Sequence, residues 1–408
     1  MAGYSFPKEK IKILLLEGVH PAAIERFREA GYTAETLPHA LDEARLCEAV
    51  RSVHFLGIRS ATQVTPAVLE AGKHLAAVGC FCIGTNQVAL EEAARRGVVV
   101  FNAPFSNTRS VAELTVAEVV MLARRAAQKS MEVHAGRWDK SARGCVEVRH
   151  KTIGIIGYGH IGPQVGLLAE AFGMKVYYYD IVPKLPLGNA EPVGSLKQLL
   201  GMVDVVTLHV PETPQTKHMI GAAELATMRP GSFLLNLSRG SVVVIDALRE
   251  ALLSGHIAGA AIDVFPEEPK SNAERFMSPL CGVENVILTP HIGGSTFEAQ
   301  RNIGLEVANA IIKYSDTGSS TGAVNFPQVE LPILGDSHRI LNIHRNVPGV
   351  LRDINRVIAE MGGNIRSQYL STSTEIGYLI TDVDSSISPT VKERIEGLDT
   401  NIRTRLLF

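Results

Sequence analysis

Apolar residues along the chain alternate between short continuous runs and stretches with helical spacing. The runs at 11–18, 54–60, 75–81 and 98–102 predict buried strands. The stretches between them predict helices, one of which carries Thr65 as N-cap before a proline at its first position. These helical stretches are 20–32, 64–72 and 89–97. Strands that alternate with helices indicate parallel βαβ units.

A second series of the same kind begins at residue 151. It starts with the segment 151–162, and its further predicted strands lie at 175–180, 204–211, 232–238, 258–265 and 285–290. The two series are separated by a long helical stretch at 110–128, which we expect from its length to bridge two lobes. The chain of 408 residues is long enough for two to four domains.

The pattern changes after residue 314. The segment 315–327 is rich in Ser, Thr and Gly and predicts a linker. The residues after it predict the order strand, helix, strand, strand, helix, strand, with an amphipathic helix at 348–363. That βαββαβ order is typical of a ferredoxin-like unit.

Bulk composition narrows the class of protein without giving a function. The net charge of -2 offers no electrostatic reason for a nucleic acid or an anionic membrane as partner. The first residues lack the apolar core of a signal peptide, and no apolar run reaches the length of about 18 residues that spans a membrane. Five cysteines lack metal-site spacing, so we expect reduced thiols, no metal and a cytoplasmic location.

A glycine motif in the second series predicts a dinucleotide site. Gly157, Gly159 and Gly162 follow a predicted strand and open a predicted helix, and Asp180 ends the next strand 18 residues after Gly162. Glycines permit a tight turn, close approach to a pyrophosphate and close packing of helix on strand. A carboxylate accepts hydrogen bonds from both ribose hydroxyls and repels a 2′-phosphate, so the cofactor expected is NAD rather than NADP.

Polar side chains follow three later strands of this series. Arg239, Asp263, Glu268 and His291 each lie at or just beyond a predicted strand end. Singly, each also fits a structural role, as a turn residue, a loop charge or a capping histidine. Together, a cation, a carboxylate and an imidazole at the edge where open α/β sheets bind ligands indicate a catalytic site.

Oxidation of a secondary alcohol by NAD accounts for this set. A histidine, whose unperturbed pKa is about 6.5, serves as general acid and base for the hydroxyl proton. We assign this role to His291. Glu268 would fix its tautomer and raise its pKa, and Arg239 would grip a substrate carboxylate.

Four motifs carry a resemblance to a known family. The segments GYGHIG, NLSRG, DVFPEEP and TPHIGGST occur in this order. From residue 10 onward the chain resembles the D-isomer-specific 2-hydroxyacid dehydrogenases of the compact bacterial type with a C-terminal ACT domain. The resemblance implies an α/β fold in which a Rossmann-like NAD-binding domain, 108–295, is inserted in a flavodoxin-like substrate domain, 1–107 with 296–327. A ferredoxin-like ACT regulatory domain, 337–408, follows.

The resemblance also assigns roles to single residues. The catalytic triad falls on Arg239, Glu268 and His291. The cofactor contacts fall on Gly157, Gly159, His160, Ile161, Gly162, Asp180, Leu237, Ser238, Asp263, Gly293 and Gly294. The substrate contacts fall on Arg59, Ser60 and Asn107, with Arg137 and Lys140 supplied by a neighbouring subunit.

The activity implied is NAD-dependent oxidation of D-3-phosphoglycerate to 3-phosphohydroxypyruvate, the entry to L-serine synthesis, by a homotetramer. L-serine is implied as the effector, bound across an interface of ACT domains by His344, Asn346 and Asn364. Amides and an imidazole suit an amino acid's carboxylate and ammonium group. A turn and helix cap without a ligand would also account for these residues.

One position departs from the family pattern and keeps two alternatives open. Close relatives carry a second arginine after Arg59 and Ser60, where this chain has Ala61. Loss of that cation favours an unphosphorylated substrate, such as hydroxypyruvate, glyoxylate or 2-oxoglutarate. A different alternative is an NAD-sensing module that recruits partners, which should show negligible turnover of any 2-oxo acid.

Overall fold

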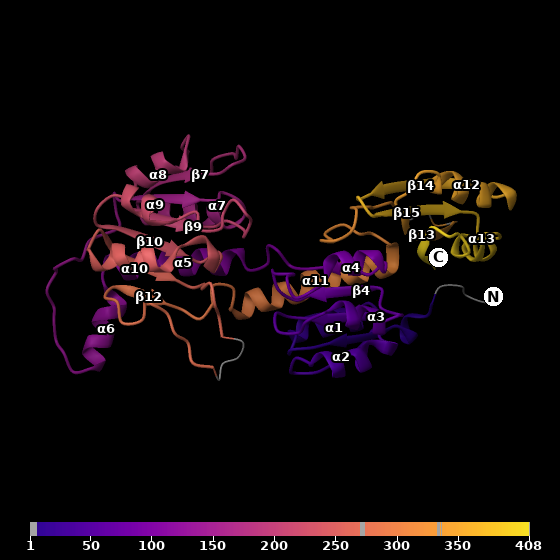
Figure 1. Ribbon diagram of the computed structural model, residues 1–408, viewed down its shortest axis with the longest axis horizontal. Helices are drawn as coiled ribbons and strands as arrows, with labels where there is room; N and C mark the ends of the chain where they lie inside the picture. The colour runs from indigo at the N-terminus through magenta and orange to yellow at the C-terminus, as the bar shows by residue number, and fades with distance from the viewer. Residues whose placement is uncertain (1–5, 270–273, 333–334, 336, 408) are drawn as a thin grey trace. The chain divides into compact units, whose positions relative to one another are not determined.

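The computed structural model describes residues 6–269, 274–332, 335 and 337–407, and the chain divides into two compact units (Figure 1). The first unit combines residues 1–106 with 301–408, and the second comprises residues 107–300. Each unit is built around its own parallel sheet.

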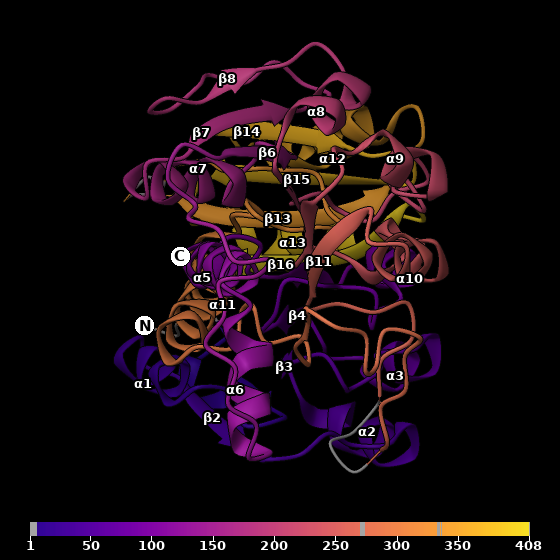
Figure 2. The ribbon, with the colours of Figure 1, turned by 90° about the vertical axis from the view of Figure 1, so that its left-hand side faces the viewer.

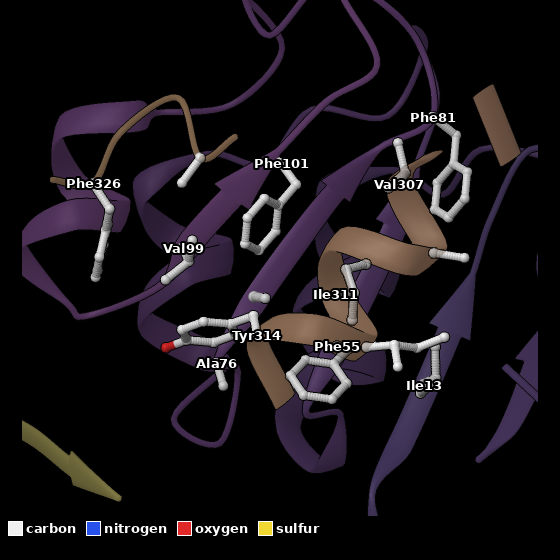
Figure 3. Close-up of a cluster of buried hydrophobic side chains, with 14 of the residues drawn as sticks. Ile13, Phe55, Ala76, Phe81, Val99, Phe101, Val307, Ile311, Tyr314 and Phe326 are labelled. Atoms are coloured by element: carbon white, nitrogen blue, oxygen red, sulfur yellow. The ribbon is translucent and has the colours of Figure 1, made fainter. Parts of the chain in front are cut away.

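The first unit contains a five-stranded parallel sheet in the order β2-β1-β3-β4-β5. On one face lie α1 (Pro21–Glu29) and α11 (Phe297–Thr317), whose Val307, Ile311 and Tyr314 pack on the strands (Figure 3). On the other face lie α2 (Glu43–Ala49), α3 (Pro66–Ala71) and α4 (Leu90–Arg95). The strands are β1 (Lys12–Leu15), β2 (Thr33–Thr36), β3 (Phe55–Ile58), β4 (Ala77–Cys80) and β5 (Val99–Phe101).

The segment 315–327 is not the flexible linker that its composition predicts. Ala323 forms a bridge with Phe101 of β5, and Asn325 bonds through its side chain to the backbone of Val98 and Val100. The serines are buried rather than solvated, and Ser320 donates to the carbonyl of Pro327 at 2.6 Å. The small polar side chains of this segment make hydrogen bonds to backbone groups and pack at the edge of the sheet. Composition alone does not distinguish such a segment from a linker.

The C-terminal part forms a four-stranded antiparallel sheet in the order β14-β15-β13-β16 (Figure 2). One face carries the two helices, and the other packs on the five-stranded lobe, where the Tyr378 hydroxyl donates to the Gly318 carbonyl at 2.5 Å. The elements are β13 (His338–Arg345), α12 (Val350–Glu360), β14 (Ile365–Thr372), β15 (Ile376–Val383), α13 (Ser388–Glu396) and β16 (Asn401–Leu407).

The second unit holds a seven-stranded parallel sheet in the order β12-β11-β10-β9-β6-β7-β8. One face is covered by α5 (Thr108–Ala123) and α7 (Ile161–Ala171), the other by α8 (Leu196–Met202), α9 (Ala222–Thr227) and α10 (Ile245–Leu253). The strands are β6 (Thr152–Ile156), β7 (Lys175–Tyr179), β8 (Glu191–Pro192), β9 (Val205–Leu208), β10 (Ser232–Asn236), β11 (Ile257–Ile262) and β12 (Val286–Leu288). The strand order reverses between β6 and β9, the point at which such sheets bind ligands.

The helical stretch 110–128 is two helices rather than one. The first, α5, belongs to the second unit and packs on α7, β10 and β11. It ends before Arg125, whose φ of 51° is left-handed, and α6 (Ala126–His134) starts in a new direction away from the sheet of its unit (Figures 1 and 2). The apolar spacing runs through the break, so the pattern alone joins the two.

In the described part of the chain, none of the helices combines the length and the apolar character needed to cross a membrane.

Candidate active site

The glycine loop joins β6 to α7, and two of its glycines are required by the protein's own packing. Gly157 has a φ of +90°, and a Cβ there would lie 2.3 Å from the carbonyl oxygen of His209. A Cβ on Gly162 would lie 2.5 Å from the Gly157 carbonyl oxygen. Gly159 differs, because a Cβ there would meet nothing within 4 Å. Gly159 therefore faces open space at the start of a helix, where a pyrophosphate can approach the backbone of His160 and Ile161.

Asp180 follows β7 and is fixed beside this loop. One carboxylate oxygen accepts the Tyr158 N–H at 2.8 Å and the other accepts the Val182 N–H at 2.9 Å. Each oxygen keeps a further lone pair, so the carboxylate can also receive ribose hydroxyls. The loop and this carboxylate fit the adenosine diphosphate half of NAD.

Close contact between two loops brings Arg239 and Glu268 to the same sheet edge. Arg239 follows β10, and a Cβ on the next residue, Gly240, would lie 2.0 Å from the backbone of Phe265. The loop after β11 turns back at this point, where the Phe265 N–H donates to Oε1 of Glu268 at 3.0 Å. The guanidinium of Arg239 is oriented by its own loop, donating to the Ser238 carbonyl at 2.7 Å.

His291 and Glu268 form a hydrogen-bonded pair, with 2.9 Å between Nδ1 and Oε2. A carboxylate only accepts, so Nδ1 carries the proton and Nε2 is the nitrogen left for chemistry. This hydrogen bond raises the pKa of His291 against the opposing effect of burial, and the negative charge of Asp263 adds to it. Burial opposes ionisation of Glu268, but the bonds from His291 and the Phe265 N–H outweigh it and lower the pKa of Glu268.

Asp263 is buried and shapes the loop that carries His291. Its Oδ1 accepts the Thr289 hydroxyl at 2.7 Å and the Ile292 N–H at 2.8 Å, and Oδ2 accepts the Gly293 N–H at 2.9 Å. Its carbonyl accepts the His291 N–H at 2.8 Å. His291 has a left-handed φ of 53°, and the bonds that Asp263 accepts from this loop hold the backbone there.

Close enough to Asp263 to feel its charge, α5 carries a carboxyl group that none of the sequence motifs contains. Glu118 is 1% exposed, and neither carboxyl oxygen has a hydrogen-bond partner among the described residues. Burial and then the negative charge of Asp263 raise the pKa of Glu118 to about 8. Its position within the apolar spacing of α5 is the sequence signal that could have found it.

The residues predicted to contact substrate are distributed over both units. Arg59 and Ser60 lie in the first unit, in the loop after β3. Asn107, in the second unit, lies against the His291 loop, because a Cβ on Gly294 would be 2.4 Å from its Nδ2. Arg137 and Lys140 are exposed in the second unit, in the segment after α6.

The three residues predicted to bind an effector do not converge within one chain. His344 is buried under β15, where Gly377 makes room for its imidazole, and Asn346 follows it at the end of β13. Asn364 precedes β14, whose Ile365 pairs with Val383 at the opposite end of the sheet. Asn346 and Asn364 are both exposed.

Two family models match the chain. Residues 116–293 match the NAD-binding domain of D-isomer specific 2-hydroxyacid dehydrogenases, and residues 340–403 match an AHAS small subunit-like ACT domain. A D-3-phosphoglycerate dehydrogenase of Escherichia coli K12 is 56% identical over the whole of both chains. The chain belongs to the D-3-phosphoglycerate dehydrogenases.

Other relatives agree with membership of this family. A D-3-phosphoglycerate dehydrogenase of Dictyostelium discoideum is 53% identical over 99% of both chains. The structure of a D-lactate dehydrogenase from Aquifex aeolicus with NAD and lactic acid has a TM-score of 0.65 and 26% identity, covering 78% of this chain and all of the other. The predicted family and fold class are thus confirmed, and the chain is an NAD-dependent dehydrogenase with an ACT domain.

Proposed function

We propose that this enzyme oxidises D-3-phosphoglycerate to 3-phosphohydroxypyruvate with NAD, the first step of L-serine synthesis, and that L-serine inhibits it through the ACT domain. The observation that carries the catalytic part is the His291–Glu268 pair, 2.9 Å apart at the edge of the sheet that also holds the glycine loop. The substrate is supported by relatives named D-3-phosphoglycerate dehydrogenase over the full length of the chain.

His291 transfers the proton in this mechanism. Bound NAD supplies the hydride acceptor. Neutral Nε2 of His291 accepts the proton of the substrate's 2-hydroxyl as its carbon is oxidised, and Glu268 stabilises the imidazolium that results. In the reverse direction the imidazolium returns the proton to the 2-oxo oxygen. Asp263 holds the loop that presents this imidazole.

Substrate binding is assigned to Arg239 at the carboxylate end and to other residues at the phosphate end. The Arg239 guanidinium binds the substrate carboxylate through two parallel hydrogen bonds, which orients the neighbouring 2-carbon. Arg59, Ser60 and Asn107 bind the remainder of the substrate, and Arg137 and Lys140 reach the phosphate from a second copy of the chain. Ala61 leaves this phosphate site one cation short of the family pattern.

Serine is proposed to bind between two ACT domains of a homotetramer. His344 and Asn346 come from one chain and Asn364 from the other. The sheet register supports this division, since the two asparagines lie at opposite ends of a single sheet.

The test is NADH oxidation with 3-phosphohydroxypyruvate, hydroxypyruvate and 2-oxoglutarate, each with and without L-serine. We expect the phosphorylated acid to have the highest kcat/KM and its turnover to be lowered by serine. A higher kcat/KM for an unphosphorylated acid would mean that Ala61 marks a change of substrate. No turnover of any of the three would favour an NAD-sensing role and contradict the proposal.

A further inference from the structure

A single carboxylate holds the loop that follows β3. Glu17, which follows β1, accepts three backbone N–H groups from this loop. Oε1 accepts those of Arg59 at 3.0 Å and Thr62 at 2.9 Å, and Oε2 accepts that of Ala61 at 3.0 Å. Three backbone donors on one side chain tie the loop from Arg59 to Thr62 to the end of β1.

The backbone at Glu17 shows that the carboxylate is placed there at a conformational cost. Glu17 has a φ of 61° and is followed by Gly18 with a φ of 60°. A left-handed conformation favours glycine or asparagine, and other residues adopt it where the surroundings require it. A glutamate at this position therefore indicates that its side chain is needed.

Another side chain, which is buried, bonds to the same loop at the carbonyl group of Arg59. Gln87 is 4% exposed, and its Nε2 donates to the Arg59 carbonyl at 2.8 Å. Glu17 thus accepts hydrogen bonds from N–H groups of the loop, and Gln87 donates to the carbonyl group of the loop's first residue, Arg59. The backbone of Arg59 is bonded on both sides, which fixes the origin of its side chain.

We propose that Glu17 is a positioning residue for the substrate, acting through the loop from Arg59 to Thr62. This inference rests on the proposed function, in which Arg59 and Ser60 contact the substrate. Glu17 does not touch the reacting atoms. It fixes the backbone from which Arg59 and Ser60 extend, so that less conformational freedom is lost when substrate binds.

The same geometry bears on the effect of Ala61. Glu17 already binds the N–H groups of Arg59, Ala61 and Thr62, which leaves Ser60 as the loop residue whose N–H Glu17 does not accept. The loop therefore cannot replace the missing cation at position 61 by turning the Ala61 N–H toward a phosphate unless it releases Glu17. Phosphate binding on this side depends on the side chain of Arg59 and on Ser60.

The test compares Glu17→Gln and Glu17→Gly with the native enzyme. A glutamine offers one acceptor oxygen and turns an NH₂ donor toward another N–H, whereas glycine removes the carboxylate and relieves the left-handed backbone. We expect KM for the best 2-oxo acid to rise roughly tenfold in Glu17→Gln and further in Glu17→Gly. The kcat and the dissociation constant for NADH should stay within about twofold, because the predicted catalytic and NAD residues lie in the other unit.

Glu35→Gln is the matched control, since Glu35 is an exposed carboxylate on the neighbouring strand β2. It should behave as the native enzyme. An unchanged KM in both Glu17 variants would overturn the proposal, as would a joint fall in kcat and melting temperature, which indicates a structural role only. The native enzyme's preference between 3-phosphohydroxypyruvate and hydroxypyruvate tests the proposed function separately, because the KM comparison applies to whichever acid it reduces best.

Discussion

Buried or half-buried carboxylates that bind consecutive backbone N–H groups recur in both units. Asp263 holds the loop of His291, and Glu17 holds the loop of Arg59. In each case a bulky residue takes a left-handed φ, 53° at His291 and 61° at Glu17. Motif spacing located Asp263 at a strand end, but it does not show which backbone groups a carboxylate serves. Glu17 lies in no motif, so only the folded backbone reveals it.

At the scale of single residues, Glu268→Gln should separate the two directions of the reaction by pH. Removing the negative charge lowers the pKa of His291, because the bond to Glu268 is the main cause of its rise. Oxidation needs neutral His291, so the acid limb of the pH profile for oxidation should move to lower pH. Reduction needs the imidazolium, so its rate should fall about 10- to 100-fold near pH 8. Profiles of kcat/KM against pH in both directions measure this.

Glu267→Gln is the control for this experiment, since it removes an adjacent exposed charge. Its two profiles should match those of the native enzyme. Identical profiles for Glu268→Gln and native enzyme would show that the pair does not set the acidity of the catalytic base.

At the scale of elements, apolar runs predicted the strands with buried residues well and missed elements whose residues are mostly exposed. The strand β2 was missed because it is an edge strand with mostly exposed residues, and α2 because it buries little besides Leu46. The break between α5 and α6 was missed because it depends on the left-handed Arg125 rather than on a change of pattern. The packed segment 315–327 was missed because its serines and Asn325 bond to backbone rather than to water.

The helix α5 should show a stability effect of its buried acid, tested by Glu118→Gln. The pKa of Glu118 is raised in the folded enzyme to about 8, so the folded state keeps a proton that the unfolded chain releases above a pKa of 4.5. The stability linked to this group is therefore complete below pH 4.5 and lost as pH rises to about 8. The loss is roughly 1.4 kcal/mol per pH unit across this window.

The glutamine variant cannot ionise, so its melting temperature should exceed that of the native enzyme at pH 8 and match it near pH 4.5. Glu113→Gln, at an exposed position of the same helix, should follow the native curve at both pH values. A difference that does not change with pH would contradict the assignment of a protonated carboxyl group to α5.

At the scale of the whole molecule, the sequence predicted the family, the fold class and the cofactor. These predictions depend on motifs whose residues are close in sequence. The predicted substrate and serine sites combine residues from distant segments and are proposed to combine residues from different chains, so the structure of one chain leaves them as proposals. The register of the ACT sheet is informative here, because it places Asn346 and Asn364 at opposite ends.

A serine site shared by two chains should show complementation between damaged copies. We expect Asn346→Ala and Asn364→Ala each to lose serine inhibition while retaining catalysis. A mixed assembly of the two variants should regain part of the inhibition, because one of the two sites at each mixed pair of ACT domains then combines native residues from both chains. Co-expression with two purification tags and assay of the doubly tagged fraction measures this. A mixed assembly as insensitive as either parent would contradict the shared site.

The helix α11 is a long, continuous element whose last turn contacts the ACT domain. It is continuous for 21 residues, or about 32 Å at the usual rise per residue. Its last turn is bonded to the ACT domain, where Arg339 donates to the Thr317 carbonyl at 3.0 Å while pairing with Asp382. In the first unit, its Val307 and Ile311 pack on the five-stranded sheet. A helix hardly stretches, so this one element keeps the ACT domain and that sheet at a constant spacing.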